Sequence, residues 1–165
     1  MGGPMWKELV DVLGKIYLAY QDMLELGGRK KAALIGVDMK GLEKLLEEEK
    51  TLAHRVQELE NKRKGVLKQL IEENKAIRPD SKLVEMYAFA PSRPVENRLK
   101  ELHKKLDDCI KEVQKLNSDN MVLTQGALQA VSFHLNRIGG ASVDPTYGNT
   151  GRDTVSHEKK FDFKA

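Results

Sequence analysis

Residues 95–138 read VENRLKELHKKLDDCIKEVQKLNSDNMVLTQGALQAVSFHLNRI, and this stretch decides the fold class. Its apolar side chains recur every three or four residues, which places them on one face of an α-helix. The period is heptad-like over about forty residues, as in helices that pack in coiled coils. Gly126 is the one internal weak point, and Gly139-Gly140 predicts the end of the helix. The stripe consists of Leu99, Leu102, Leu106, Cys109, Ile110, Val113, Leu116, Asn120, Leu123, Ala127, Leu128, Val131, Leu135 and Ile138.

A second long stripe lies in residues 38–77. Asp38 is a favourable residue to cap the start of this helix. Arg63 interrupts the apolar face, and Gly65 weakens the helix by roughly 1 kcal/mol relative to alanine. A helix of about forty residues is about 60 Å long, so we expect a rod. The connector over residues 78–94 is short, which predicts that the two long helices are antiparallel neighbours.

A shorter first helix is predicted over residues 4–27. Gly27-Gly28 predicts its end, because glycine readily adopts the left-handed conformation of a helix C-cap. Residues 29–37 are ambiguous between helix and loop. A first helix of this length covers only about half of the rod. An apolar seam should therefore stay uncovered, available to a partner helix or to a second copy of the chain.

The remaining segments predict little regular structure. Asp80 or Ser81 could cap one short helix that runs through Met86-Tyr87. The last 27 residues are polar and contain too few apolar side chains to fold alone. We therefore expect an all-α fold: an elongated antiparallel helical hairpin or three-helix coiled-coil bundle over residues 1–138, followed by a flexible polar C-terminal tail over residues 139–165.

Composition excludes several functional classes. The net charge of +3 results from 28 basic and 25 acidic residues, which is too balanced for a dedicated nucleic-acid-binding protein. A single cysteine permits no intramolecular disulfide and fits a reducing compartment. Neither a signal-peptide apolar run nor a stretch of 18 apolar residues occurs. The sequence therefore predicts a cytoplasmic protein.

Side chains that could support catalysis are few. The histidines are far apart along the chain, and no pair has the spacing of metal ligands. Cys109 lies on the long stripe, where we interpret it as a small buried hydrophobic residue. No glycine-rich loop of a nucleotide-binding protein is present. We expect a protein that is not an enzyme and that has no cofactor and no metal.

Two polar features stay open to interpretation. Asn117, Asn120, Thr124 and Gln125 make the middle of the last long helix more polar than its start. They could set the register of the bundle as a polar layer, or they could supply hydrogen bonds to a bound partner. Tyr147 in the tail is either incidental or an anchor for docking.

The arrangement of these motifs resembles the FlgN family of flagellar export chaperones over most of residues 5–151. Residues 33–49 read ALIGVDMKGLEKLLEEE and open the long hairpin in the manner of this family. An asparagine-rich step follows at Leu116-Asn117-Ser118-Asp119-Asn120, and the helix then ends at Gly139-Gly140. The tail contains Thr146-Tyr147-Gly148, the last element of the resemblance.

The resemblance implies a type III export chaperone for the hook-associated proteins of the hook–filament junction. Such a chaperone binds the terminal helical segments of its clients, prevents their premature assembly and delivers them to the export gate. The expected partners are hook-associated proteins and the cytoplasmic domain of an export-gate membrane protein. Tyr147 would dock to this gate. The client-binding residues implied by position are Asn120, Leu123, Ala127, Leu128, Val131 and Leu135.

The alternative is a structural coiled-coil protein that self-associates through the same uncovered seam, and weak self-association is compatible with either function. A tight dimer without a client would favour the structural protein. An enzyme would need a converging acid, base and nucleophile, which the sequence does not show.

Overall fold

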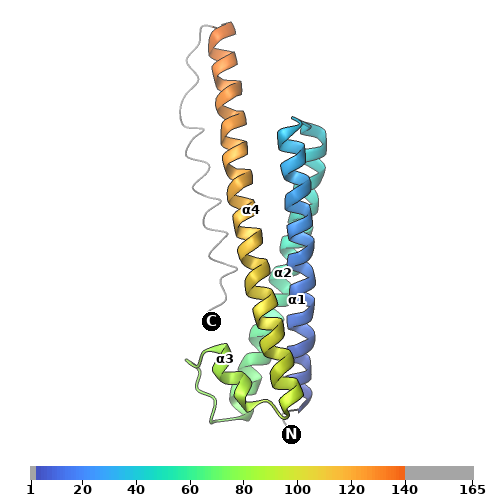
Figure 1. Ribbon diagram of the computed structural model, residues 1–165, viewed down its shortest axis with the longest axis vertical. Helices are drawn as coiled ribbons and strands as arrows, with labels where there is room; N and C mark the ends of the chain where they lie inside the picture. Colours follow the sequence, from blue (N-terminus) through green and yellow to red (C-terminus); the bar gives the residue numbers. More distant parts are fainter. Residues whose placement is uncertain (1–2, 140–165) are drawn as a thin grey trace.

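The computed structural model describes residues 3–139, which form an elongated helical bundle (Figure 1). Helix α1 spans Gly3–Ile35, α2 spans Met39–Glu73 and α4 spans Arg93–Gly139. Between α2 and α4 lie the short helix α3, Leu83–Met86, and the 3-10 helix η1, Tyr87–Phe89. These described residues contain no strand, so the predicted all-α class is confirmed. The predicted tail lies outside them.

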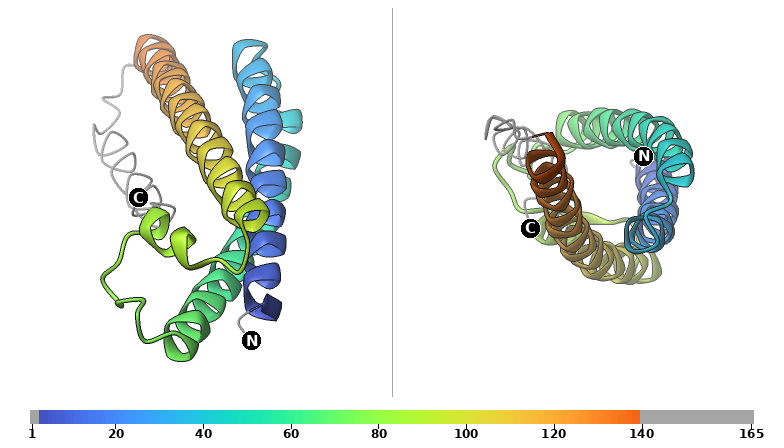
Figure 2. Two further views of the ribbon diagram at one scale, coloured as in Figure 1. Left: turned by 60° about the horizontal axis from the view of Figure 1, so that its bottom comes forward. Right: turned by 90° about the horizontal axis from the view of Figure 1, so that it is seen from above.

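Helix α1 is the central helix of the bundle. It packs closely along α2, to which it is antiparallel, and along α4, to which it is parallel (Figures 1 and 2). The two longest helices, α2 and α4, approach each other less closely than either approaches α1. The prediction that these two would be the main neighbouring pair is therefore wrong. The reason is that α1 continues to Ile35, beyond its predicted end, and packs its apolar face against both helices.

Two glycines in α1 do not end the helix, contrary to the prediction. Gly27 and Gly28 both lie inside α1, which continues to Ile35. A Cβ atom added at Gly27 would lie 2.7 Å from Cδ2 of Leu116 in α4. Gly27 therefore allows a close approach between two helices rather than a cap.

The turn between α1 and α2 contains an unusual backbone conformation. Val37 has a φ of 53° and is the only non-glycine residue with a positive φ among residues 3–139. This conformation costs of order 1–3 kcal/mol for such a residue. Asp38 then caps α2 as predicted, because its Oδ1 accepts a hydrogen bond of 2.9 Å from the backbone N–H of Gly41.

Helix α2 ends earlier than predicted, at Glu73 rather than at residue 77. The chain becomes extended at Asn74, and Ile77 is buried in the core without being helical. The predicted short helix of the connector is confirmed as α3 and η1, but its N-cap residue is Lys82 rather than Asp80 or Ser81. The Ser81 hydroxyl instead accepts a hydrogen bond from a backbone amide three residues earlier.

The three long helices share one apolar core. Arg63, predicted to interrupt the α2 stripe, is itself buried and donates to Oε2 of the buried Glu60 at 2.9 and 3.1 Å. Tyr20 of α1 is buried beside this ion pair, and burial, reinforced by Glu60, raises the pKa of its phenol. The large side chains that are fully buried are Tyr20, Tyr87, Leu9, Leu13, Ile16, Leu70, Ile77, Leu99, Leu102, Val12 and Val56.

The connector is fixed to the start of α4 by a buried polar contact. The hydroxyl of Tyr87 lies 3.1 Å from Nδ1 of His103, and the two rings meet edge to face. Burial raises the pKa of Tyr87, because a phenolate would lose its hydration there. The N-terminal part of α4 therefore packs against the connector as well as against α1.

Candidate functional site

The apolar stripe of α4 changes its environment at Asn120. Up to this residue the stripe is buried against α1 and the core, and Asn120 itself is only 4% exposed. Beyond it, Leu128, Val131 and Leu135 are between 44% and 55% exposed, and Ile138 is 85% exposed. We call residues 121–139 the distal segment of α4. Figure 1 shows this segment extending past the α1–α2 hairpin.

A single polar contact marks the boundary between the two parts of α4. Nδ2 of Asn120 donates a hydrogen bond of 3.0 Å to the carbonyl oxygen of Gly27, and this bond is buried. Oδ1 of Asn120 is also buried and has no hydrogen-bond partner among residues 3–139. Leu116 packs on Gly27 one turn earlier. Figures 1 and 2 show that α4 and the α1–α2 hairpin diverge towards the end where α4 extends. The buried bond from Asn120 acts as a polar register contact within the bundle.

The residues predicted to bind a partner fall on both sides of this boundary. Asn120 is buried in the bundle, and Leu123 is half-buried next to it. Ala127, Leu128, Val131 and Leu135 are exposed. Their spacing of one, three and four residues gathers them on one face of the helix. Tyr147 lies outside the residues that the structure describes.

The opposite face of the distal segment is also apolar, which the sequence reasoning missed. Val122 and Phe133 are 67% and 62% exposed. They are eleven residues apart, or about three helical turns, and therefore share a face. Val122 and Val131 are nine residues apart, which places them on opposite faces. The distal segment thus exposes apolar side chains in two directions.

A signal for this surface is present in the sequence. Residues 120–136 contain no Asp, Glu, Lys or Arg over 17 positions, whereas 13 of the 27 residues at 93–119 are charged. Solvated helices normally carry charges on their outer face. Residues 120–136 therefore lack the charged outer face that solvated helices normally have.

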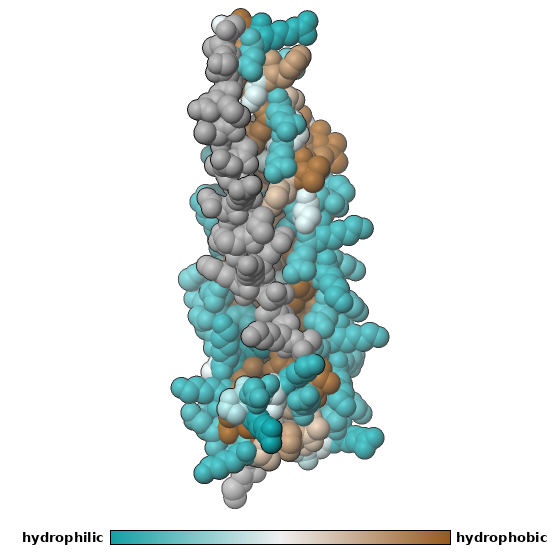
Figure 3. Space-filling view, turned by 90° about the vertical axis from the view of Figure 1, so that its left-hand side faces the viewer, coloured by the Kyte–Doolittle hydropathy of each residue, from teal (hydrophilic) through white to brown (hydrophobic). Residues whose placement is uncertain are grey.

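The space-filling view shows how this surface differs from the flanks of the bundle (Figure 3). Hydrophilic side chains cover most of the flanks. Hydrophobic residues, drawn in brown, are visible towards the end where α4 extends and again around the connector at the other end. The exposed apolar residues near the connector are Val84 and Phe89, which form a smaller group.

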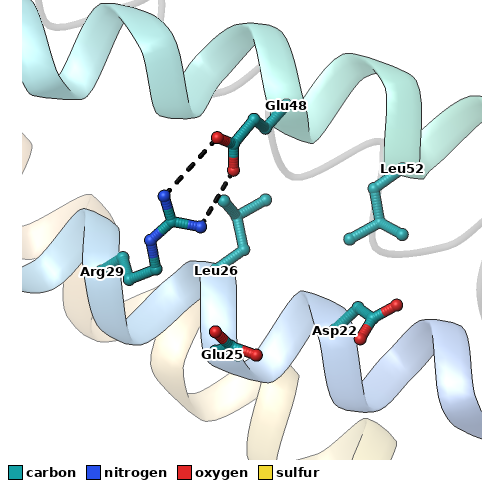
Figure 4. Close-up of a pocket in the computed structure, with 6 residues that line it drawn as sticks. All are labelled: Asp22, Glu25, Leu26, Arg29, Glu48 and Leu52. Carbon is teal, nitrogen blue, oxygen red and sulfur yellow. Dashed lines mark hydrogen bonds and ion pairs between the residues drawn. The ribbon is translucent and has the colours of Figure 1, made fainter.

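A shallow depression between α1 and α2 is lined mainly by charged residues (Figure 4). Its principal contact is the ion pair between Arg29 and Glu48, with nitrogen–oxygen distances of 3.0 and 3.5 Å. Leu26 and Leu52 supply its only apolar walls. Ligand pockets are usually enclosed and mostly apolar, so we interpret this depression as a solvated surface between two helices.

The distal segment contains one histidine and no Cys, Asp or Glu. Within residues 3–139 no three His, Cys, Asp or Glu side chains are grouped to hold a metal ion. Cys109 is buried as predicted, and burial raises the pKa of its thiol, which disfavours the nucleophilic thiolate. None of the helices in this range is long and apolar enough to cross a membrane.

The comparison with known families agrees with this geometry. The family model described as FlgN protein matches residues 5–154, which is nearly the whole chain. No significant match was found among curated proteins or among solved structures.

Proposed function

The chain belongs to the FlgN family of flagellar export chaperones, and from this premise we propose that the distal segment of α4 binds the terminal helical segments of hook-associated proteins. The family is one of chaperones for flagellar substrate proteins and not of enzymes. The observation that carries the proposal is the stripe of α4, which loses its cover at Asn120 and continues as an uncharged, exposed surface.

The mode of binding follows from the periodicity of this surface. A client segment that forms an amphipathic helix would place its apolar stripe on Leu128, Val131 and Leu135, as in other helix-in-groove complexes. The client would then continue the bundle where α1 no longer covers α4. Its assembly surface would be covered at the same time, which prevents premature assembly.

The expected affinity is moderate. A standard interface buries about 1,600 Å², and apolar burial contributes about 25 cal/mol per Å². Association and the ordering of side chains offset much of this gain, so we expect dissociation constants between micromolar and nanomolar. Such a complex can dissociate without ATP and without any covalent step. This reversibility suits a chaperone that must release its client.

Delivery to the export gate is a separate part of the proposal. We assign gate docking to Tyr147 on the basis of the family resemblance. The gate is a membrane protein, and its cytoplasmic domain would be the partner of a chaperone that acts in the cytoplasm. Tyr147→Ala should leave client affinity unchanged and reduce export of the client. Reduced client affinity would instead place Tyr147 in the client site.

The test of client binding is co-purification of the chain with hook-associated proteins of the same bacterium, followed by light scattering of the product. We expect a complex of defined mass that contains both proteins, and a monomer or weak dimer for the chaperone alone. A tight homodimer that captures no client would contradict the proposal. It would assign the distal segment to self-association.

A further inference from the structure

The turn between α1 and α2 carries a second exposed apolar group. Ile35, Val37 and Met39 are between 65% and 73% exposed, although they occupy three of five successive positions. We call these three residues the hairpin tip. Large hydrophobic residues that are exposed singly need no explanation, but a group of three at one end of a molecule indicates a contact surface.

The backbone at the hairpin tip argues against a purely structural role for Val37. Its φ of 53° lies in the left-handed region, where glycine or asparagine is tolerated and a β-branched residue is a clear outlier. Turn geometry therefore disfavours valine here. Core packing does not explain it either, because 73% of the residue is exposed. The remaining use for this side chain is contact with another molecule.

The hairpin tip lies level with the start of the exposed stripe. Helices α1 and α4 run in the same direction from the contact between Gly27 and Asn120. Ile35 and Leu128 are each eight residues further along, or about 12 Å at the usual helical rise. Figures 1 and 2 show that α4 and the hairpin diverge towards this end of the molecule. Two exposed apolar surfaces therefore flank the same region.

We propose that the hairpin tip is the second wall of the client site, so that one amphipathic helix of a hook-associated protein packs against the tip and the distal segment together. This inference rests on the proposed function. A stable interface involves about 20–30 residues on each side, which exceeds one face of the 19-residue distal segment. The tip supplies further apolar contacts level with the start of the exposed stripe.

The occupant is inferred from the apolar character of both walls. Residues 120–136 contain no Asp, Glu, Lys or Arg, and the three tip residues are apolar, although the exposed Asp38 lies between Val37 and Met39. A strongly charged partner segment would have to bury its charges against apolar side chains, which is costly. A helix with apolar side chains on two adjoining faces fits both walls.

The test compares substitutions at the two walls in the full chain. Val37→Asn introduces a residue that accepts the left-handed conformation more readily than valine, and Met39→Gln keeps side-chain length at an exposed position. Calorimetric titration with a purified hook-associated protein should show about tenfold weaker binding for the double variant. Its melting temperature should be unchanged or higher. Val84→Gln, at the connector, is the matched control and should leave both quantities unchanged.

Leu128→Asp, measured together with the double variant at the tip and its control, distinguishes failure of this inference from failure of the proposed function. If Leu128→Asp weakens binding and the double variant at the tip does not, the second wall is overturned while the client site on α4 stands. If Leu128→Asp has no effect, the proposed function of the distal segment fails, whatever the tip does. Weakening by both changes supports a site with two walls.

Crosslinking identifies what occupies the tip. The native Cys109 is the only cysteine and is buried, so Val37→Cys can be labelled selectively with a photoreactive group. We expect an adduct with the hook-associated protein in the complex. An adduct only between two copies of the chain, or only within one copy, would overturn the assignment of the tip to the client.

Discussion

A single carboxylate in the distal segment should weaken client binding about a hundredfold without unfolding the chaperone. Leu128 is 44% exposed in the free protein, and complete burial of a leucine is worth about 1.5–3 kcal/mol. Leu128→Asp therefore removes about 1 kcal/mol of binding free energy, which the client would contribute by covering the exposed part of this leucine. The new carboxylate also costs at least about 2 kcal/mol where it meets an apolar partner. The sum of about 3 kcal/mol corresponds to a hundredfold or larger increase in Kd.

The free protein should tolerate the same change. The side chain lies beyond Asn120, where α4 has no covering helix. Replacing leucine by aspartate in an exposed helix costs about 0.5 kcal/mol in propensity, and loss of the part of Leu128 that is already buried adds about 1 kcal/mol. For a chain of this size the total lowers the melting temperature by about 3–6 °C. Circular dichroism should therefore show unchanged helix content.

Calorimetric titration with a hook-associated protein measures the expected loss, with Leu18→Asp as the control. Leu18 is an exposed leucine in the middle of α1, so the control makes the same change in charge and propensity outside the site. Its Kd should stay within about twofold of the native value. A Kd for Leu128→Asp within threefold of the control would refute the reasoning. Val131→Asp should behave like Leu128→Asp.

Three further predictions concern stability. Gly28→Ala should raise the free energy of unfolding by about 0.5–1 kcal/mol, because nothing lies within 4 Å of the added methyl group. In the same thermal melt, Gly27→Ala should raise this free energy by less, because its methyl group would press against Leu116 of α4. Arg63→Met should lower the free energy of unfolding, measured with urea, by about 3–5 kcal/mol, because it leaves the carboxylate of Glu60 buried without its cation. The double variant Arg63→Met with Glu60→Leu should recover most of that loss. The raised pKa of Tyr87 predicts stability that is fully present below pH about 10 and falls as the pH rises further, with phenolate absorbance appearing only on unfolding.

The sequence predicts the long helices of this fold well. The apolar period of residues 95–138 identifies α4 almost to its ends, because a stripe of this length has no other regular structure that buries it. The capping role of Asp38 is equally local, and it is confirmed. In both cases the deciding interactions lie within one helix or one turn.

The predictions are wrong where the conformation or burial of a residue depends on a distant part of the chain. Gly27-Gly28 has the local signature of a helix end, but the approach of Leu116, about ninety positions later, keeps α1 helical there. The burial of Arg63 could not be predicted either, because it depends on a core formed by three helices. The central position of α1 follows from the same long-range packing.

The candidate site was predictable in part. Periodicity selected Leu128, Val131 and Leu135 as members of one face, but it could not show where α1 stops covering that face. The charge-free run at residues 120–136 was a local signal for the boundary. Phe133 was missed because it lies off the stripe, and only the exposure of the whole distal segment gives it a role.

The boundary at Asn120 can be explained by what α1 offers beyond Gly27. The next residue on the same face, one turn later, is Lys31. An apolar α4 stripe packed over this lysine would have to bury a charge, which is costly without a partner. Asn120 ends the seam just before that point, where its side-chain N–H donates to the Gly27 carbonyl. One helix thereby contributes to the stability of the bundle with its first part and keeps its last part open for a client.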